Sequence, residues 1–152
     1  MKIYVGGDHA GFELKEQVKQ YLLELGMQVE DMGPYEVNTE DDYPDFVIPL
    51  ARKVGEDPEH ARGILFGGSG QGEAIAANKV RGVRAAVYYG GTIDIITLSR
   101  KDNDANILSL GARFVDIGQA KMAVDIWLNA PFDGGERHKR RVNKIKAFEE
   151  GF

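Results

Sequence analysis

The stretch GILFGGSGQGEAIAAN, residues 63–78, decides the fold of this chain. Its first four residues are mostly apolar, as in a short buried strand, and a glycine-rich loop leads from them into residues that favour a helix. A strand that runs through glycines into a helix is the start of a βα unit. We therefore expect a strand over Gly63–Phe66 and a helix from about Gly70 to Asn78.

The rest of the chain repeats this alternation. Four further short runs predict strands, at Lys2–Val5, Met27–Met32, Ala85–Tyr88 and Ile107–Leu110. Helical spacing predicts helices over 14–25, Pro44–Val54, Ile93–Arg100 and Ala120–Asn129. Five βα units predict an α/β fold, in which a five-stranded parallel sheet carries helices on both faces. Residues 131–136 (PFDGGE) break the pattern, and a basic helix follows them.

Length and composition limit the possible functions. The 152 residues fit a single domain over 1–152, and such a chain buries roughly two-thirds of its unfolded surface. With no cysteine, the chain has no disulfide, thiolate metal site or cysteine nucleophile. The net charge of −5 argues against a nucleic-acid partner. No run resembles a signal peptide or a membrane span, so we expect no membrane contact and a cytoplasmic location.

The loop 67–72 has the glycine spacing of a phosphate-binding loop but lacks its chemistry. Glu73 and Ala74 stand where a nucleotide-binding loop has Lys and then Ser or Thr, and no G-x-G-x-x-G is present. What remains is a set of backbone N–H groups at a helix start, suited to an oxyanion or to developing enolate charge. The glycines that bring this backbone close to a ligand are Gly68, Gly70 and Gly72.

Two interpretations fit the loop and Glu73. The loop forms a tight turn and Glu73 interacts with the helix dipole, or the loop binds an oxyanion and Glu73 acts as a base. A carboxylate beside backbone amides can remove a proton next to a carbonyl while the amides hold the oxygen that gains charge. The sequence therefore makes Glu73 a candidate general base.

The end of the first strand and the basic segment near the C-terminus supply further candidates. Asp8 and His9 follow the first strand, where an N-cap and a turn residue also explain them. Arg137 and Arg141 share one side of the last helix, where two guanidiniums suit a phosphate monoester and a solvated face is the alternative. The acidic run 40–45 is interpreted as a solvated loop and helix cap with no histidine nearby, so we expect no metal there.

Five ordered motifs resemble the ribose-5-phosphate isomerase B family, which also contains galactose-6-phosphate and allose-6-phosphate isomerases. These motifs are GGDHAGFELK, DDYPD, GILFGGSGQGEAIAANKVRGVRAA, RKDNDANILSLGAR and GGERHKRR. The resemblance implies a Rossmann-like subunit, a homodimer or dimer of dimers with shared active sites, and an aldose–ketose isomerase that uses an enediolate. It implies no metal and no cofactor.

The resemblance also implies roles for individual residues. One branch of the family has a cysteine base where this chain has Gly67, and the other has a glutamate base where it has Glu73. This chain resembles the glutamate branch. Sugar oxygens would then be held by Asp8, Ser69 and Asn103. The substrate phosphate would be held by His9, Arg113, Arg137 and Arg141, with the last two supplied by the partner subunit.

The chain departs from the family pattern at Asp102. The family has a histidine there, to which ring opening is assigned, and an aspartate is a poor acid near neutral pH. A shifted substrate preference, or an isomerase of another sugar phosphate, is therefore open. A non-catalytic sugar-phosphate binding protein is open too, because it would keep the arginines without needing Glu73. A response-regulator-like domain is excluded, because the third strand ends in Phe66-Gly67-Gly68 and has no acceptor aspartate.

Overall fold

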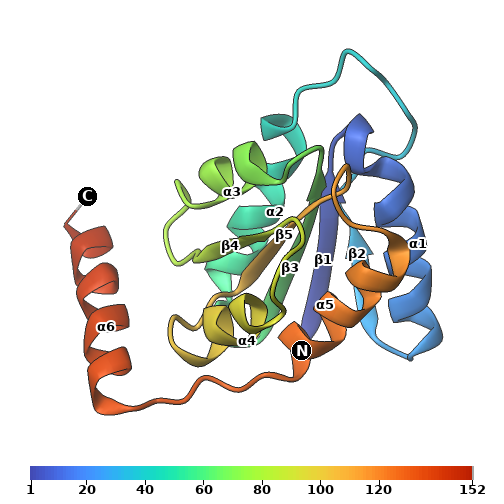
Figure 1. The fold of residues 1–152 in the computed structure, drawn as a ribbon. Coiled ribbons are helices and arrows are strands. Elements are labelled where there is room, and N and C mark those ends of the chain that lie inside the picture. The colour runs from blue at the N-terminus through green and yellow to red at the C-terminus, as the bar shows by residue number, and fades with distance from the viewer. Residues whose placement is uncertain (152) are drawn as a thin grey trace.

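The computed structural model describes residues 1–151, and strands and helices alternate along most of the chain (Figure 1). The strands are β1 (Lys2–Gly7), β2 (Gln28–Asp31), β3 (Ala61–Gly67), β4 (Ala85–Tyr88) and β5 (Ile107–Gly111). The helices are η1 (His9–Gly11), α1 (Phe12–Glu24), α2 (Pro44–Glu56), α3 (Gln71–Ala77), α4 (Asp94–Lys101), α5 (Ile117–Asn129) and α6 (Glu136–Glu150).

The five strands form one parallel sheet in the order β2-β1-β3-β5-β4. Successive side chains of a strand point to opposite faces, so Ile64 and Phe66 of β3 face one helical layer and Leu65 faces the other. The first layer contains α1, α4 and α5, and its core includes the fully buried Trp127. The second contains α2 and α3, with Leu50 at its centre. The predicted three-layer α/β fold is confirmed.

The direction of the strands separates two edges of the sheet. Residues after β1 and β3 lie at the carboxyl edge, where the strands end, uppermost in Figure 1. Residues 102–106 lie at the opposite, amino edge, because α4 runs back from the carboxyl edge and β5 starts at Ile107, paired with Gly63 and Ala85. Residues that are predicted to act together within one subunit must therefore lie at the same edge of the sheet.

Helix α6 stands apart from the sheet and its covering helices (Figure 1). The segment 130–135 leads to it, and the backbone N–H of Asp133 donates to the carbonyl oxygen of Lys101 (3.0 Å). A second link joins α6 to the segment before β4, where the Gly82 N–H donates to Glu149 Oε2 (3.1 Å).

Apolar side chains of α6 lie beside a cavity of about 790 Å³ between this helix and the β4 edge of the sheet. Ile145 and Phe148 contribute to its lining and are still 47% and 69% exposed. Within residues 1–151, no helix is both long and apolar enough to cross a membrane.

Candidate active site

Glycine at position 67 makes room for the carboxylate of Glu73. A Cβ atom at Gly67 would fall on that carboxylate, so a side chain there and Glu73 in this orientation exclude each other. Gly70, the residue before α3, has a φ of +76°, a conformation that side chains with a Cβ seldom adopt. Its carbonyl oxygen accepts a hydrogen bond from the buried hydroxyl of Ser109 (2.6 Å). The loop thus holds Glu73 in the first turn of α3.

Glu73 is only 4% exposed, although it is a carboxylic acid. Burial raises the pKa of Glu73 above its usual range, its own backbone N–H opposes that rise, and the nearby Asp8 carboxylate adds to it. A carboxylate with a raised pKa is a stronger base than an ordinary glutamate and is still ionised at a pH above that value. The position therefore suits proton transfer.

The raised pKa of Glu73 predicts that Glu73→Gln stabilises the fold. A group whose pKa is higher in the folded state contributes most stability below its unfolded pKa, and this contribution is lost as the pH rises through the folded value. At neutral pH the wild-type protein therefore bears the cost of a buried charge, which glutamine removes. We expect thermal unfolding of the unliganded variant to occur about 2–4 °C higher, the shift that about 1 kcal/mol gives in a chain of this size.

The same comparison of thermal unfolding at acidic pH is the control. The difference between the variant and the wild type should shrink at about pH 4, where Glu73 is largely neutral in both states. A variant that is equally stable or less stable at neutral pH would contradict the burial argument.

Asp8 connects the end of β1 to the first helical turn. The backbone N–H groups of Ala10 and Gly11 donate to Asp8 Oδ1 (3.0 and 3.2 Å), so Asp8 is an N-cap, as one interpretation predicted. The same carboxyl group is close enough to Glu73 to raise the pKa of that residue. Asp8 therefore caps η1 and also faces the candidate base.

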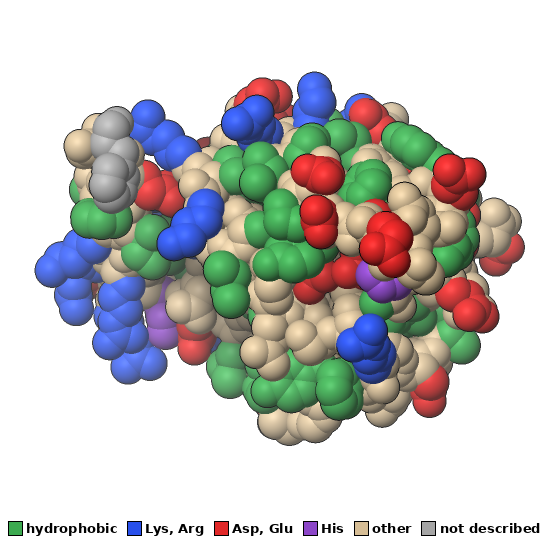
Figure 2. All heavy atoms as spheres, turned by 90° about the horizontal axis from the view of Figure 1, so that it is seen from above, with side chains coloured by type: hydrophobic (Ala, Val, Ile, Leu, Met, Phe, Trp, Pro, Cys, Tyr) green, Lys and Arg blue, Asp and Glu red, His purple; other side chains and the backbone are tan. Residues whose placement is uncertain are grey.

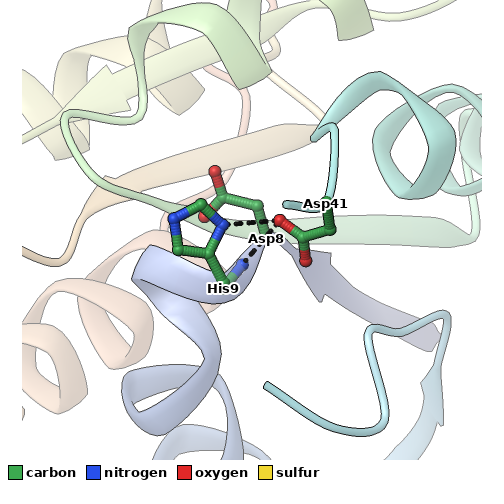
Figure 3. Close-up of side chains that lie close together, drawn as sticks. All are labelled: Asp8, His9 and Asp41. Atoms are coloured by element: carbon green, nitrogen blue, oxygen red, sulfur yellow. Dashed lines mark hydrogen bonds and ion pairs between the residues drawn. The ribbon is translucent and has the colours of Figure 1, made fainter. Parts of the chain in front are cut away.

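His9 is held by Asp41, which comes from the loop between β2 and α2 (Figure 3). The Nδ1 atom and the backbone N–H of His9 lie 2.6 and 3.2 Å from Asp41 Oδ1. The expectation that no histidine lies near the acidic run 40–45 is therefore wrong, because sequence separation concealed this contact. Ligand atoms of Asp8, His9 and Asp41 lie within 4.8 Å of one another, a grouping that could hold a metal ion. An ion pair between His9 and Asp41 explains the short contact equally well. The expected absence of a metal stays a prediction.

The remaining candidates at the carboxyl edge lie in the loop 67–72 or in contact with it. Ser69 accepts a hydrogen bond from the backbone N–H of Gln71 (3.3 Å). Gly68 lies against the guanidinium of Arg113, and Gly72 lies against the ring of Tyr43. Figure 2, which looks down on this edge, shows acidic side chains and a histidine near the middle of the face.

Four predicted site residues lie elsewhere in the chain, at or near the amino edge. Asp102 and Asn103 follow α4, and Arg84 fixes this turn by donating from Nε to the carbonyl oxygens of Asn103 and Asp104 (3.2 and 2.9 Å). Arg137 and Arg141 are exposed on α6, the lobe at the left of Figure 2, where basic side chains gather.

His138 connects the two parts of this second group. Its Nε2 atom lies 3.7 Å from Asp102 Oδ1 and 3.3 Å from Nε of Arg137. One chain therefore assembles two groups of candidates. Asp8, His9, Gly68, Ser69, Gly70, Gly72, Glu73 and Arg113 form the carboxyl-edge group. Asp102, Asn103, Arg137 and Arg141 form the amino-edge group.

Sequence reasoning missed Asp41 and Tyr43 as members of the carboxyl-edge group. Both lie in the loop that ends at α2, and Tyr43 belongs to the DDYPD motif that helped to carry the family resemblance. The acidic run looked like solvated surface, yet the side chain of Asp41 is only 6% exposed. The available signal was the position of the loop, because the loop after β2 ends beside the loop after β1 in a parallel sheet.

Comparisons with known proteins identify the family of this chain. The model of the family described as Ribose/Galactose Isomerase matches residues 3–145. "Ribose-5-phosphate isomerase B" of Mycolicibacterium paratuberculosis is 39% identical over 149 residues, which cover 98% of this chain and 92% of that protein.

Two solved structures are similar over nearly their whole length. Ribose-5-phosphate isomerase B from Mycoplasma genitalium with bound ribulose-5-phosphate gives a TM-score of 0.94 at 38% identity and covers 99% of this chain and 97% of that one. The Clostridium thermocellum enzyme gives 0.91 at 44% identity and covers 99% of each chain. The chain therefore belongs to the ribose/galactose isomerase family and is, by class, an isomerase.

Proposed function

We propose that the protein interconverts a phosphorylated aldose and ketose, with ribose 5-phosphate and ribulose 5-phosphate as the substrate pair. The observation that carries this proposal is the buried Glu73 carboxyl group, whose pKa is raised and which lies beside Asp8 at the carboxyl edge. Full-length similarity to proteins named ribose-5-phosphate isomerase B supports the choice of substrate.

Glu73 is the proposed proton carrier of the reaction. It removes the proton from C2 of the open-chain aldose, and the carbonyl oxygen on C1 takes up the charge, which gives an enediolate. Ser69, Asp8 and the loop amides hold the sugar oxygens. Negative charge on these oxygens strengthens the hydrogen bonds that the Ser69 hydroxyl and the loop N–H groups donate to them. Glu73 then returns the proton to C1, while the proton of the C2 hydroxyl passes to the charged oxygen on C1, which leaves the ketose with a C1 hydroxyl and a C2 carbonyl. One carboxyl group alternates between base and acid, a task that a raised pKa favours.

The proposed active site needs two subunits. The carboxyl-edge group contains the candidate base, but Arg137, Arg141, Asp102 and Asn103 lie at or near the opposite edge of the same chain. A homodimer in which the amino edge of one subunit meets the carboxyl edge of its partner completes both sites by one symmetry operation. The exposed apolar side chains of the separate helix α6 are consistent with such an interface.

The phosphate of the substrate is the proposed ligand of the basic groups. His9 and Arg113 come from the subunit that provides Glu73, and Arg137 and Arg141 come from its partner. Guanidinium groups bind phosphate oxygens in a fixed planar geometry, and these basic groups more than offset the two negative charges of a phosphate monoester.

The second candidate is an isomerase for another sugar phosphate, and Asp102 is the observation that favours it. An ionised aspartate can accept the anomeric proton but is a poor donor to the ring oxygen. A substrate that is largely open-chain, or one with different stereochemistry, would depend less on such a donor. The same enzyme would then prefer a different pentose or hexose phosphate.

Incubation with ribose 5-phosphate is expected to yield ribulose 5-phosphate, with direct detection of the ketose by NMR or chromatography. Galactose 6-phosphate and allose 6-phosphate run in parallel test the second candidate. Binding of all these compounds without any product would show a non-catalytic binding protein and overturn the proposal.

Asp102→His provides the matched comparison in this assay. Ribulose 5-phosphate cannot close a furanose ring through its phosphate-bearing carbon, so only the aldose direction needs ring opening. We expect the substitution to speed single turnovers of ribose 5-phosphate much more than those of ribulose 5-phosphate. Equal effects in both directions would assign Asp102 to recognition or structure.

A further inference from the structure

The contact between His9 and Asp41 is built into the carboxyl edge. Asp41 Oδ1 accepts from both the backbone N–H and Nδ1 of His9, so one carboxylate oxygen fixes the main chain and the ring together. The Asp41 side chain is 6% exposed and that of His9 is 29% exposed. The aspartate is therefore buried behind a histidine that keeps one side open to the site.

The geometry determines which ring nitrogen reaches a ligand. Nδ1 is occupied by Asp41, and Figure 3 shows the second ring nitrogen pointing away from that carboxylate. A histidine bonded through Nδ1 to a carboxylate presents Nε2 in a fixed direction. His9 therefore offers a single, oriented nitrogen to whatever binds at this edge.

The surrounding charges favour the protonated ring. The hydrogen bond to Asp41 raises the pKa of His9, and the charges of Asp41 and Asp8 add to this rise, while partial burial and the Arg113 guanidinium oppose it. The second oxygen of Asp41, Oδ2, is buried without a hydrogen-bond partner in residues 1–151. A buried carboxylate that lacks donors on one side gains most from a full positive charge on the other.

We propose that Asp41 is a positioning residue that holds His9 as an imidazolium with Nε2 directed at the phosphate of the substrate. This inference rests on the proposed function and deepens it. His9 and Arg113 would repel each other in the empty site, and Asp41 offsets that repulsion before any phosphate arrives. The phosphate then meets two cations already in place, so less of its binding energy is lost in arranging them.

The chain contains a matched pair for comparison. His60 Nδ1 lies 2.8 Å from Asp57 Oδ1, but these side chains are exposed and precede β3 at the amino edge. Asp57→Asn therefore removes the same kind of contact from a place that the proposal does not involve.

The test compares Asp41→Asn with Asp57→Asn by NMR titration of the three histidine rings, using inorganic phosphate as the probe. Asp41→Asn should lower the pKa of His9 and weaken phosphate binding about tenfold near pH 7.5, the effect of losing one charge-assisted hydrogen bond. The KM for the sugar phosphate should rise by a similar factor while kcat changes little. Asp57→Asn should leave the His9 pKa, phosphate binding and the KM unchanged.

Three outcomes would overturn the inference. They are a lower His9 pKa with unchanged phosphate binding, weaker phosphate binding with an unchanged His9 pKa, and a loss of thermal stability with neither change, as a purely structural contact would give. A measurement on the wild type alone does not depend on how the variants fold. Added phosphate should change the NMR signals of the His9 ring and leave those of the His60 ring unchanged. Phosphate binding does not require turnover, so an inactive protein would disprove the proposed function and still leave the role of Asp41 measurable.

Discussion

Glu73→Gln is expected to lower kcat for ribose 5-phosphate isomerisation by at least about 100-fold. Glutamine keeps the size and most of the hydrogen bonding of glutamate, but it cannot take the proton from C2. The buried position of Glu73 makes the loss specific, because Asp8, the carboxyl group beside it, already accepts hydrogen bonds from two backbone N–H groups. Ketose formation followed directly over time gives the measurement.

Glu13→Gln is the matched control for this experiment. Glu13 also lies in the first turn of a helix that begins near the carboxyl edge, but its side chain is exposed. Its replacement should leave kcat close to the wild-type value. Near-full activity of Glu73→Gln would remove Glu73 from the mechanism, and equal losses in both variants would point to a general effect of charge.

Mixing two inactive variants is expected to restore activity. One variant is Glu73→Gln, and the other is Arg137→Ala/Arg141→Ala. In a mixed dimer, the first subunit supplies intact arginines and the second supplies an intact Glu73, so one of the two sites is complete. Random exchange makes about half of the dimers mixed, and the mixture should recover about a quarter of the wild-type activity.

The control mixture combines Glu73→Gln with Asp8→Asn. Both changes lie at the carboxyl edge, so neither site of a mixed dimer is complete and no activity should return. Recovery in this control, or no recovery in the first mixture after subunit exchange has been demonstrated, would contradict a site shared between the two edges.

The elements of the fold were predictable because their signals are local. The strand over Gly63–Phe66 and the helix from about Gly70 emerged as β3 and α3 with small changes at their ends. The helix expected from Ala120 begins earlier, at Ile117, because Asp116 and Gln119 form a reciprocal capping box. That signal was present in the sequence but weaker than the apolar spacing on which the prediction relied.

The order of the strands depends on interactions that periodicity does not encode. β5 lies between β3 and β4, so the last strand of the chain is inside the sheet and β4 is at its edge. Nothing in the apolar pattern distinguishes this order from one in which β4 lies next to β3. The order matters to the second group of candidates, because it places the start of β5, which follows the turn 102–106, between Gly63 of β3 and Ala85 of β4.

The candidate site was predictable in part. Asp8, His9 and Glu73 follow strand ends, and parallel strands bring such residues to one edge. The partnership of His9 with Asp41 was hidden, because 32 residues separate them and an acidic run most often faces solvent. Asp102 and Asn103 differ from these residues, because they precede β5 and therefore lie at the other edge of the sheet.

The crowding between Gly67 and Glu73 also bears on how this family diverges. The carboxylate of Glu73 fills the space where a Cβ atom at position 67 would stand, so the two alternative bases that the family resemblance implies, a cysteine at 67 and a glutamate at 73, compete for one space. A lineage that gains one of these bases before it loses the other must move one of the two side chains out of this space. A lineage that loses the second base first passes through an ancestor with no base. We therefore expect the residues at positions 67 and 73 to change together wherever the base of this family changes.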